Sequence, residues 1–116
     1  MSECIFCKIS QGGGLEPKPL RESELAVIIP DIRPSAPVHY LVIPKRHIAS
    51  IADITEADEV LIGSMIHMAK EAARDLNLSG YKLVFNVGRD GGQVVEHIHL
   101  HILGGWSKEE KPTINV

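Results

Sequence analysis

The sequence lacks an excess of basic residues and any long apolar run, and each absence narrows what the protein can do. Its 116 residues carry 12 Lys and Arg against 15 Asp and Glu, a formal net charge of −3. Because proteins that bind nucleic acid polymers usually present a basic face, this balance argues against such a partner but not against a single nucleotide. No apolar run is long enough to cross a bilayer, so we expect no membrane partner.

Cysteine is also scarce, with only Cys4 and Cys7 present. The first ten residues contain neither the basic region nor the apolar stretch of a secretion signal, so we expect a cytoplasmic, reducing setting. A structural disulfide is disfavoured in that setting, which leaves a redox pair, half of a metal site, or a coincidence near a terminus. The redox interpretation is the weaker one, because no strand precedes the two cysteines.

Three histidines occupy alternate positions, His97, His99 and His101, separated by aliphatic residues. Because successive side chains of a strand point to opposite faces, a strand here places three imidazoles on one face and an apolar row on the other. A metal-binding surface and a solvated strand face are the plain alternatives. The neighbouring Gly-Gly-Gln turn at 91–93 favours a functional site, since glycine lets backbone N–H groups approach an anion.

Periodicity elsewhere predicts an α+β fold with a mostly antiparallel sheet of about five strands. Alternating or β-branched runs predict strands over 21–23, 25–29, 39–43, 81–87 and the histidine segment. Apolar residues recur at helical spacing between Leu61 and Leu76, after a capping pair at Thr55 and Asp58, which predicts one long helix. A short apolar stripe around Cys7 predicts a second, short helix near the N-terminus.

The chain shows no break in composition, so residues 1–116 are expected to form a single domain. The core covers about 3–105, and the polar stretch 106–116 is expected to be a tail. Residues 30–37 hold three prolines and no glycine, so this loop is stiff and suits either a connector or a ligand wall.

The segment QVVEHIHLHIL at 93–103 resembles the signature of the histidine-triad superfamily, in which three histidines alternate with hydrophobic residues. Further segments resemble the bacterial type of its Hint branch, the histidine-triad nucleotide-binding proteins: IFCKI at 5–9, DIRPSAPVH at 31–39, and Asn86 with the Gly-Gly-Gln turn. The resemblance covers about residues 3–105. It implies a homodimeric α+β fold, a purine mononucleotide site and no organic cofactor.

The resemblance implies a hydrolase or transferase that acts on the α-phosphate of purine nucleoside phosphoramidates or related nucleotidyl conjugates. His99 would attack the phosphorus as a neutral imidazole, and water would hydrolyse the nucleotidyl-histidine and release a nucleoside monophosphate. His101 and the Gln93 amide would contact phosphate oxygens, and His97 and His39 would support the nucleophile. The residues that the resemblance assigns to nucleotide binding are Phe6, Ile29, Asp31, Ile32, Asn86, Gly92, Gln93, Val94, His99 and His101.

The resemblance also gives the two cysteines partners. Some bacterial members hold a zinc through a C-x-x-C pair and two histidines, which here would be Cys4, Cys7, His47 and His97. Two thiolates and two imidazoles suit a closed structural zinc site, which would pin the N-terminus to the histidine segment and orient His97.

Two features depart from the Hint pattern. Val94 stands where Hint members often carry a hydroxyl residue that helps the leaving group, and the tail does not match the eukaryotic ending. Two other hypotheses therefore remain beside the enzyme: a purine nucleotide-binding regulator with little turnover, and a zinc-stabilised interaction module whose histidines bind metal.

Overall fold

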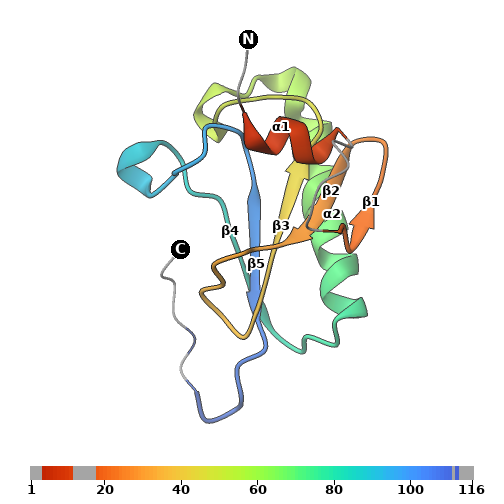
Figure 1. Ribbon diagram of the computed structural model, residues 1–116, viewed down its shortest axis with the longest axis vertical. Helices are drawn as coiled ribbons and strands as arrows, with labels where there is room; N and C mark the ends of the chain where they lie inside the picture. Colours follow the sequence, from red (N-terminus) through yellow and green to blue (C-terminus); the bar gives the residue numbers. More distant parts are fainter. Residues whose placement is uncertain (1–3, 12–17, 111, 113–116) are drawn as a thin grey trace.

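A five-stranded antiparallel sheet forms the centre of the protein in the computed structural model, which describes residues 4–11, 18–110 and 112 (Figure 1). The strand order is β1-β2-β3-β5-β4. The strands are β1 (Arg21–Glu22), β2 (Ala26–Pro30), β3 (Val38–Pro44), β4 (Tyr81–Val84) and β5 (Leu100–Gly104). The helices are α1 (Ile5–Ser10) and α2 (Glu59–Asp75), with 3-10 turns at Ile51–Asp53, Glu56–Asp58 and Arg89–Gly91. The predicted α+β fold, with one long and one short helix, is confirmed.

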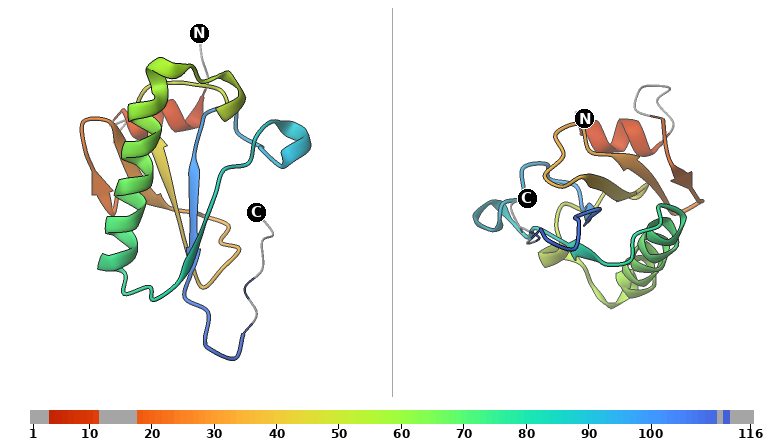
Figure 2. Two further views of the ribbon diagram at one scale, coloured as in Figure 1. Left: turned by 180° about the vertical axis from the view of Figure 1, so that it is seen from behind. Right: turned by 90° about the horizontal axis from the view of Figure 1, so that it is seen from below.

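The two helices lie on opposite faces of the sheet (Figure 2). One core packs against α2 and takes Ile28 of β2, Val42 of β3 and Ile102 of β5. The other lies beneath α1 and takes Ile29 of β2 and Leu41 of β3, the neighbours that point the other way. Strand β2 reads as a continuous apolar run because it is buried on both faces.

The register of the sheet decides which core each histidine joins. Leu41 pairs with His101 across β3 and β5, so the His101 ring lies on the α1 face, whereas Val42 pairs with Leu100 on the α2 face. The aliphatic residues between the histidines therefore fill the α2 core, as their alternation predicts.

The histidine segment is strand over only part of its length. Strand β5 begins at Leu100, so His97 and His99 precede it, and the prediction of a strand through all three histidines is wrong in extent. The backbone there is held differently, by a hydrogen bond of 2.8 Å from the Ile98 N–H to the Ile48 carbonyl. Likewise β4 ends at Val84, so Asn86 lies in the loop beyond it.

The start of the long helix follows its predicted chemistry. Thr55 and Asp58 form a capping box around the 3-10 turn that leads into α2. Asp58 is buried and forms an ion pair of 2.7 Å with Arg46, which ties the helix start to the loop after β3. At the other end Asn77 takes a positive φ of 58°, which stops the helix. None of the helices in the described residues has the length and apolarity needed to span a membrane.

Candidate active site

A cavity of about 470 Å³ opens on the α1 face of the sheet, between α1, the proline-rich loop and the start of β5. Its lining includes all but one of the residues predicted to bind a nucleotide, the exception being Gln93. These lining residues are Phe6, Ile29, Asp31, Ile32, Asn86, Gly92, Val94, His99 and His101, and His39 joins them. The stiff loop at 30–37 is therefore a wall of the cavity.

Some lining residues were not singled out from the sequence: Ile5, Ile9, Pro30, Arg33, Ser35, Leu41 and Val95. Two of them carry a detectable signal. Ile9 lies three residues after Phe6 on α1, and Leu41 lies two residues after His39 on β3, so each shares a face with a predicted residue. Arg33 and Ser35 carry no periodic signal, because an irregular loop has no period, and only the prediction for the 30–37 loop as a whole covers them.

The environment of His99 fixes which of its ring nitrogens carries the hydrogen. Its Nδ1 lies 2.8 Å from the His97 carbonyl oxygen, which can only accept, so Nδ1 donates. Nε2 is then the unprotonated nitrogen of the ring that lines the cavity. Burial lowers the pKa of His99, although the His97 carbonyl and Asp31 act in the opposite direction, so the ring is neutral near pH 7.

His39 and His101 form a hydrogen-bonded chain whose direction is set by the backbone. The Ser35 N–H donates to Nδ1 of His39 at 2.9 Å, so Nε2 of His39 carries the hydrogen and donates to Nδ1 of His101 at 2.9 Å. The hydrogen of His101 is then on Nε2. That nitrogen is buried and has no hydrogen-bond partner among the described residues. An unpaired buried donor is costly, and a ligand oxygen in the cavity would satisfy it.

His101 is neutral for reasons that the geometry explains. Burial, then the neighbouring His99 and His39 rings, lower the pKa of His101 to about 4, against a smaller opposite effect of Asp31. Burial also lowers the pKa of His39. The floor of the cavity therefore holds uncharged imidazoles that offer one lone pair and one N–H.

Asp31 joins the loop to this histidine chain. Its Oδ1 accepts from the Arg33 N–H at 2.8 Å, which shapes the turn after β2, and its Oδ2 lies 3.4 Å from Nε2 of His39. The carboxylate is thus held at the wall of the cavity rather than free in solvent, with 18% of its side chain exposed.

Gln93 has a different environment from the one expected of a phosphate ligand. Its amide nitrogen donates to the Ala49 and Val95 carbonyls at 2.6 and 2.9 Å, and its Oε1 accepts from the Gly88 N–H at 2.9 Å. Both amide hydrogens are therefore engaged within the chain. Gln93 closes the loop 88–92, which we call the glycine loop. Its Gly88 and Gly92 take positive φ angles of 74° and 92°.

The glycine loop also leaves fewer backbone donors than its sequence indicates. The N–H groups of Gly92 and Gln93 donate to the Arg89 and Gly88 carbonyls, both at 3.0 Å. Of the three N–H groups of Gly92, Gln93 and Val94, that of Val94 has no partner within the described chain, so Val94 has a backbone donor to offer. Its side chain is 91% exposed at the mouth of the cavity.

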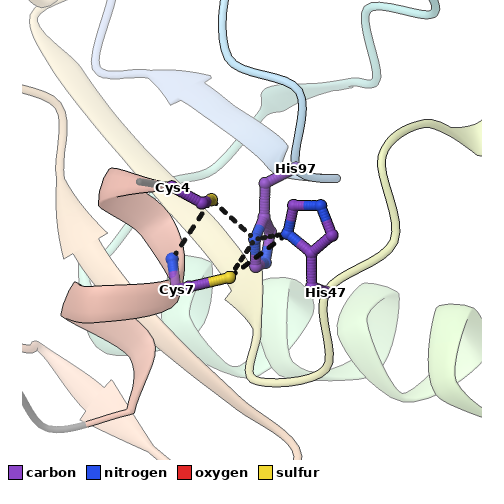
Figure 3. A group of neighbouring side chains, drawn as sticks. All are labelled: Cys4, Cys7, His47 and His97. Carbon is purple, nitrogen blue, oxygen red and sulfur yellow. Dashed lines mark hydrogen bonds between the residues drawn. The ribbon is translucent and has the colours of Figure 1, made fainter. Parts of the chain in front are cut away.

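The four residues expected to hold zinc converge beside this site (Figure 3). The Sγ atoms of Cys4 and Cys7 lie 3.3 and 3.5 Å from Nδ1 of His97. Nδ1 of His47 lies 3.2 Å from the Cys7 sulfur and 3.1 Å from Nδ1 of His97. Ligand atoms around a tetrahedral zinc are separated by roughly 3.3–3.8 Å, given bonds of about 2.0–2.3 Å. We call these four residues the cysteine–histidine cluster.

The tautomer of His97 provides a test of this fit. Nε2 of His97 lies 2.8 Å from the Pro44 carbonyl oxygen and must donate to it, so the lone pair is on Nδ1, the atom that faces the two sulfurs. A backbone carbonyl behind a ligating histidine is the usual arrangement in metal sites. The residues therefore fit a zinc ion, with two thiolates and two imidazoles as ligands.

A second group of potential ligands, Asp31, His39 and His101, does not pass the same test. The Ser35 N–H occupies Nδ1 of His39, so the nitrogen that faces the group carries a hydrogen and has no lone pair for a metal. The two groups thus differ in chemistry, and the one in the cavity is suited to hydrogen bonding.

The chain is similar to known proteins over most of its length. The family model described as "Scavenger mRNA decapping enzyme C-term binding" matches residues 3–113. Protein HitA of Neisseria gonorrhoeae is 39% identical over 105 residues, which cover 90% of this chain and 97% of that protein.

Two solved structures are also similar to most of this chain. A HIT family hydrolase from Legionella pneumophila Philadelphia 1 is 47% identical, with a TM-score of 0.86 over 90% of this chain and 95% of that chain. A Zn-bound histidine triad family protein from Mycobacterium smegmatis is 31% identical, with a TM-score of 0.78 over 93% of this chain and 78% of that chain.

Replacing His47 by Ala is expected to weaken zinc binding by a factor of at least about 10–100, because one of four ligands is lost. His67 is the matched control: it is also an exposed histidine, but it lies on α2 away from the cluster. Competition with a chromophoric chelator measures both affinities. Equal zinc affinities for His47→Ala and His67→Ala would contradict the assignment of the cluster.

Acid is expected to destabilise the fold through His101. A histidine whose pKa is lower in the folded state contributes stability above the unfolded value near 6.5 and loses it as the pH falls toward 4. Between pH 7.5 and pH 5 this loss is about 2 kcal/mol. The His101→Asn variant does not titrate, so urea unfolding should show its stability deficit against the wild type shrinking by that amount. Parallel pH profiles would count against the buried neutral ring.

Proposed function

The chain belongs to the histidine-triad family, and on that premise we propose that it is a nucleotidyl hydrolase or transferase. Its substrates are purine nucleoside phosphoramidates or related nucleotidyl conjugates, cleaved between the α-phosphorus and the leaving group. The fold and the hydrolase relatives support the coarser role of a nucleotide hydrolase. The single observation that carries the finer proposal is the hydrogen bond from Nδ1 of His99 to the His97 carbonyl, which leaves a lone pair on the cavity side.

In the first step Nε2 of His99 attacks the α-phosphorus, and the bond from phosphorus to the leaving nitrogen or oxygen breaks. The ring becomes a cationic nucleotidyl-histidine, whose charge is stabilised by the His97 carbonyl and by Asp31, the two groups that raise the pKa of His99. The leaving group takes a proton from solvent at the open mouth, where Val94 offers no hydroxyl. In the second step water attacks phosphorus and releases a proton to solvent, the P–N bond breaks with its electron pair returning to Nε2 of His99, and a nucleoside monophosphate leaves.

Negative charge on the phosphate oxygens is met by the unpaired N–H on Nε2 of His101. The chain from Ser35 through His39 keeps that hydrogen on the correct nitrogen. Preorganised donors of this kind are worth about 3 kcal/mol each in a transition state. The Val94 N–H is a second candidate donor at the same edge of the cavity.

The nucleoside occupies the apolar part of the cavity. Phe6, Ile29 and Ile32 provide walls for the purine, and Ile32 is 84% exposed, so the base itself would cover it. Asp31 accepts from the ribose hydroxyls, and Asn86 contacts the ribose or phosphate. In this proposal Gln93 is a positioning residue: its three hydrogen bonds hold the glycine loop against the residues that follow β3.

Zinc, when bound by the cysteine–histidine cluster, supplies structural cross-linking rather than chemistry on the substrate, because all four ligand positions are protein atoms. A homodimer is the proposed assembly. Strand β4 is an edge of the sheet, and Tyr81 and Leu83 on it are each 37% exposed, so a second copy would cover apolar surface there.

One observation favours the regulator as a second candidate. The Val94 side chain cannot protonate a leaving amine, so turnover depends on solvent and is expected to be slow. A nucleotide-binding regulator would use the same cavity and the same His101 donor, but it would not need the lone pair on His99.

Replacing His99 by Ala should abolish the nucleotidyl adduct and reduce kcat by at least about a thousandfold with adenosine 5′-phosphoramidate, because the nucleophile is lost. Binding of AMP should weaken far less, since the walls and His101 remain. Rapid quenching with mass spectrometry measures the adduct, and titration calorimetry measures binding. A wild-type protein that binds AMP without any adduct or turnover would favour the regulator.

A further inference from the structure

Phe6 and His97 connect the cysteine–histidine cluster to the cavity: Phe6 lies between the two cysteines of the cluster and lines the cavity, and His97 belongs to the cluster and holds His99 of the cavity through its carbonyl. We propose that metal binding at the cluster raises the affinity of the cavity for a nucleoside monophosphate, with Phe6 as the positioning residue that carries the effect. The inference rests on the proposed function in one respect, namely that the cavity binds a nucleotide.

The first route runs through α1. Phe6 lies between the two cysteines, so its backbone position is set from both sides by residues of the cluster. Its ring meets the His97 and His99 rings edge to face, with centroids 6.1 and 5.0 Å apart, and lines the cavity. A displacement of α1 therefore moves a wall of the cavity and the packing of the nucleophile together.

The helix that carries Phe6 is too short to hold its own position. It has six residues, and an isolated helix of that length is unstable in water. Its place is set by Phe6 in the core beneath it and by the contacts of Cys4 and Cys7 with His47 and His97 (Figure 3). A metal would replace these contacts of 3.2–3.5 Å with coordinate bonds and fix α1 to the sheet.

The second route runs through His97 itself. Its ring is fully buried, with Nδ1 facing the thiols and Nε2 bonded to the Pro44 carbonyl. Its main-chain carbonyl accepts the hydrogen bond that fixes the tautomer of His99. Because one residue serves as ligand and as the support of the nucleophile, a ring held by a metal also holds that carbonyl.

Thermodynamic linkage makes the proposal measurable in both directions. If metal and nucleotide favour the same placement of α1, each must raise the affinity of the other by the same factor. The expected factor is on the order of tenfold, within the usual range for coupled sites. Titration calorimetry of AMP into zinc-loaded and chelator-stripped protein measures it in one direction. A zinc competition assay with and without saturating AMP measures it in the other.

A pair of variants on α1 separates coupling from simple wall contacts. Phe6→Leu keeps an apolar side chain but removes the ring that meets His97 and His99, so the ratio of AMP affinities with and without zinc should fall severalfold toward one, with the remainder carried by His97. Ile9→Ala also removes a wall residue of α1, but Ile9 does not lie between the cysteines. It should weaken AMP binding equally in both forms and leave the ratio unchanged.

Two results would overturn the inference. One is equal AMP affinity in the loaded and stripped protein, which would leave the proposed function intact because AMP still binds. The other is a ratio that persists unchanged in Phe6→Leu, which excludes Phe6 as the carrier even if the stripped chain unfolds. Circular dichroism of the stripped protein shows whether it is still folded, and so whether a loss of AMP affinity comes from coupling or from unfolding. A protein that binds AMP in neither form would instead count against the proposed function.

Discussion

The hydrogen bond between Nδ1 of His99 and the His97 carbonyl is the contact on which the rest of the site depends. It decides that the lone pair of the ring faces the cavity and not the main chain. The His97 carbonyl that accepts it lies in the segment before β5, outside the hydrogen-bond ladder of the sheet. The group that orients the His99 ring therefore belongs to the irregular backbone that precedes Leu100.

Backbone groups assign a role to each ring in the same way. The Pro44 carbonyl turns the lone pair of His97 toward the thiols, and the Ser35 N–H turns the hydrogen of His39 toward His101. Four neutral imidazoles within one site thus behave as one nucleophile, one metal ligand, one relay and one donor. None of these differences lies in the side chains themselves.

This explains what the sequence predicts well and what it does not. Alternation predicts the two faces of β5, the capping pair predicts the start of α2, and the resemblance identifies most residues that line the cavity. Gln93 is the predicted nucleotide-binding residue that does not line the cavity. Its residue type suits a phosphate ligand, but its amide nitrogen donates a hydrogen bond to the carbonyl of Ala49, 44 positions away. Such a partner depends on tertiary structure and leaves no local pattern. Ser35 sets the tautomer of His39 through its backbone N–H, which every residue except proline possesses.

The most direct test of the account is the tautomeric state of each ring, measured by long-range ¹H–¹⁵N correlation NMR on protein labelled in its histidines. The account predicts that near pH 7.5 His99 is neutral with its hydrogen on Nδ1, whereas His39, His97 and His101 are neutral with theirs on Nε2. A spectrum that places the hydrogen of His99 on Nε2, or shows that ring protonated, would contradict the central claim, since no lone pair would then face the cavity.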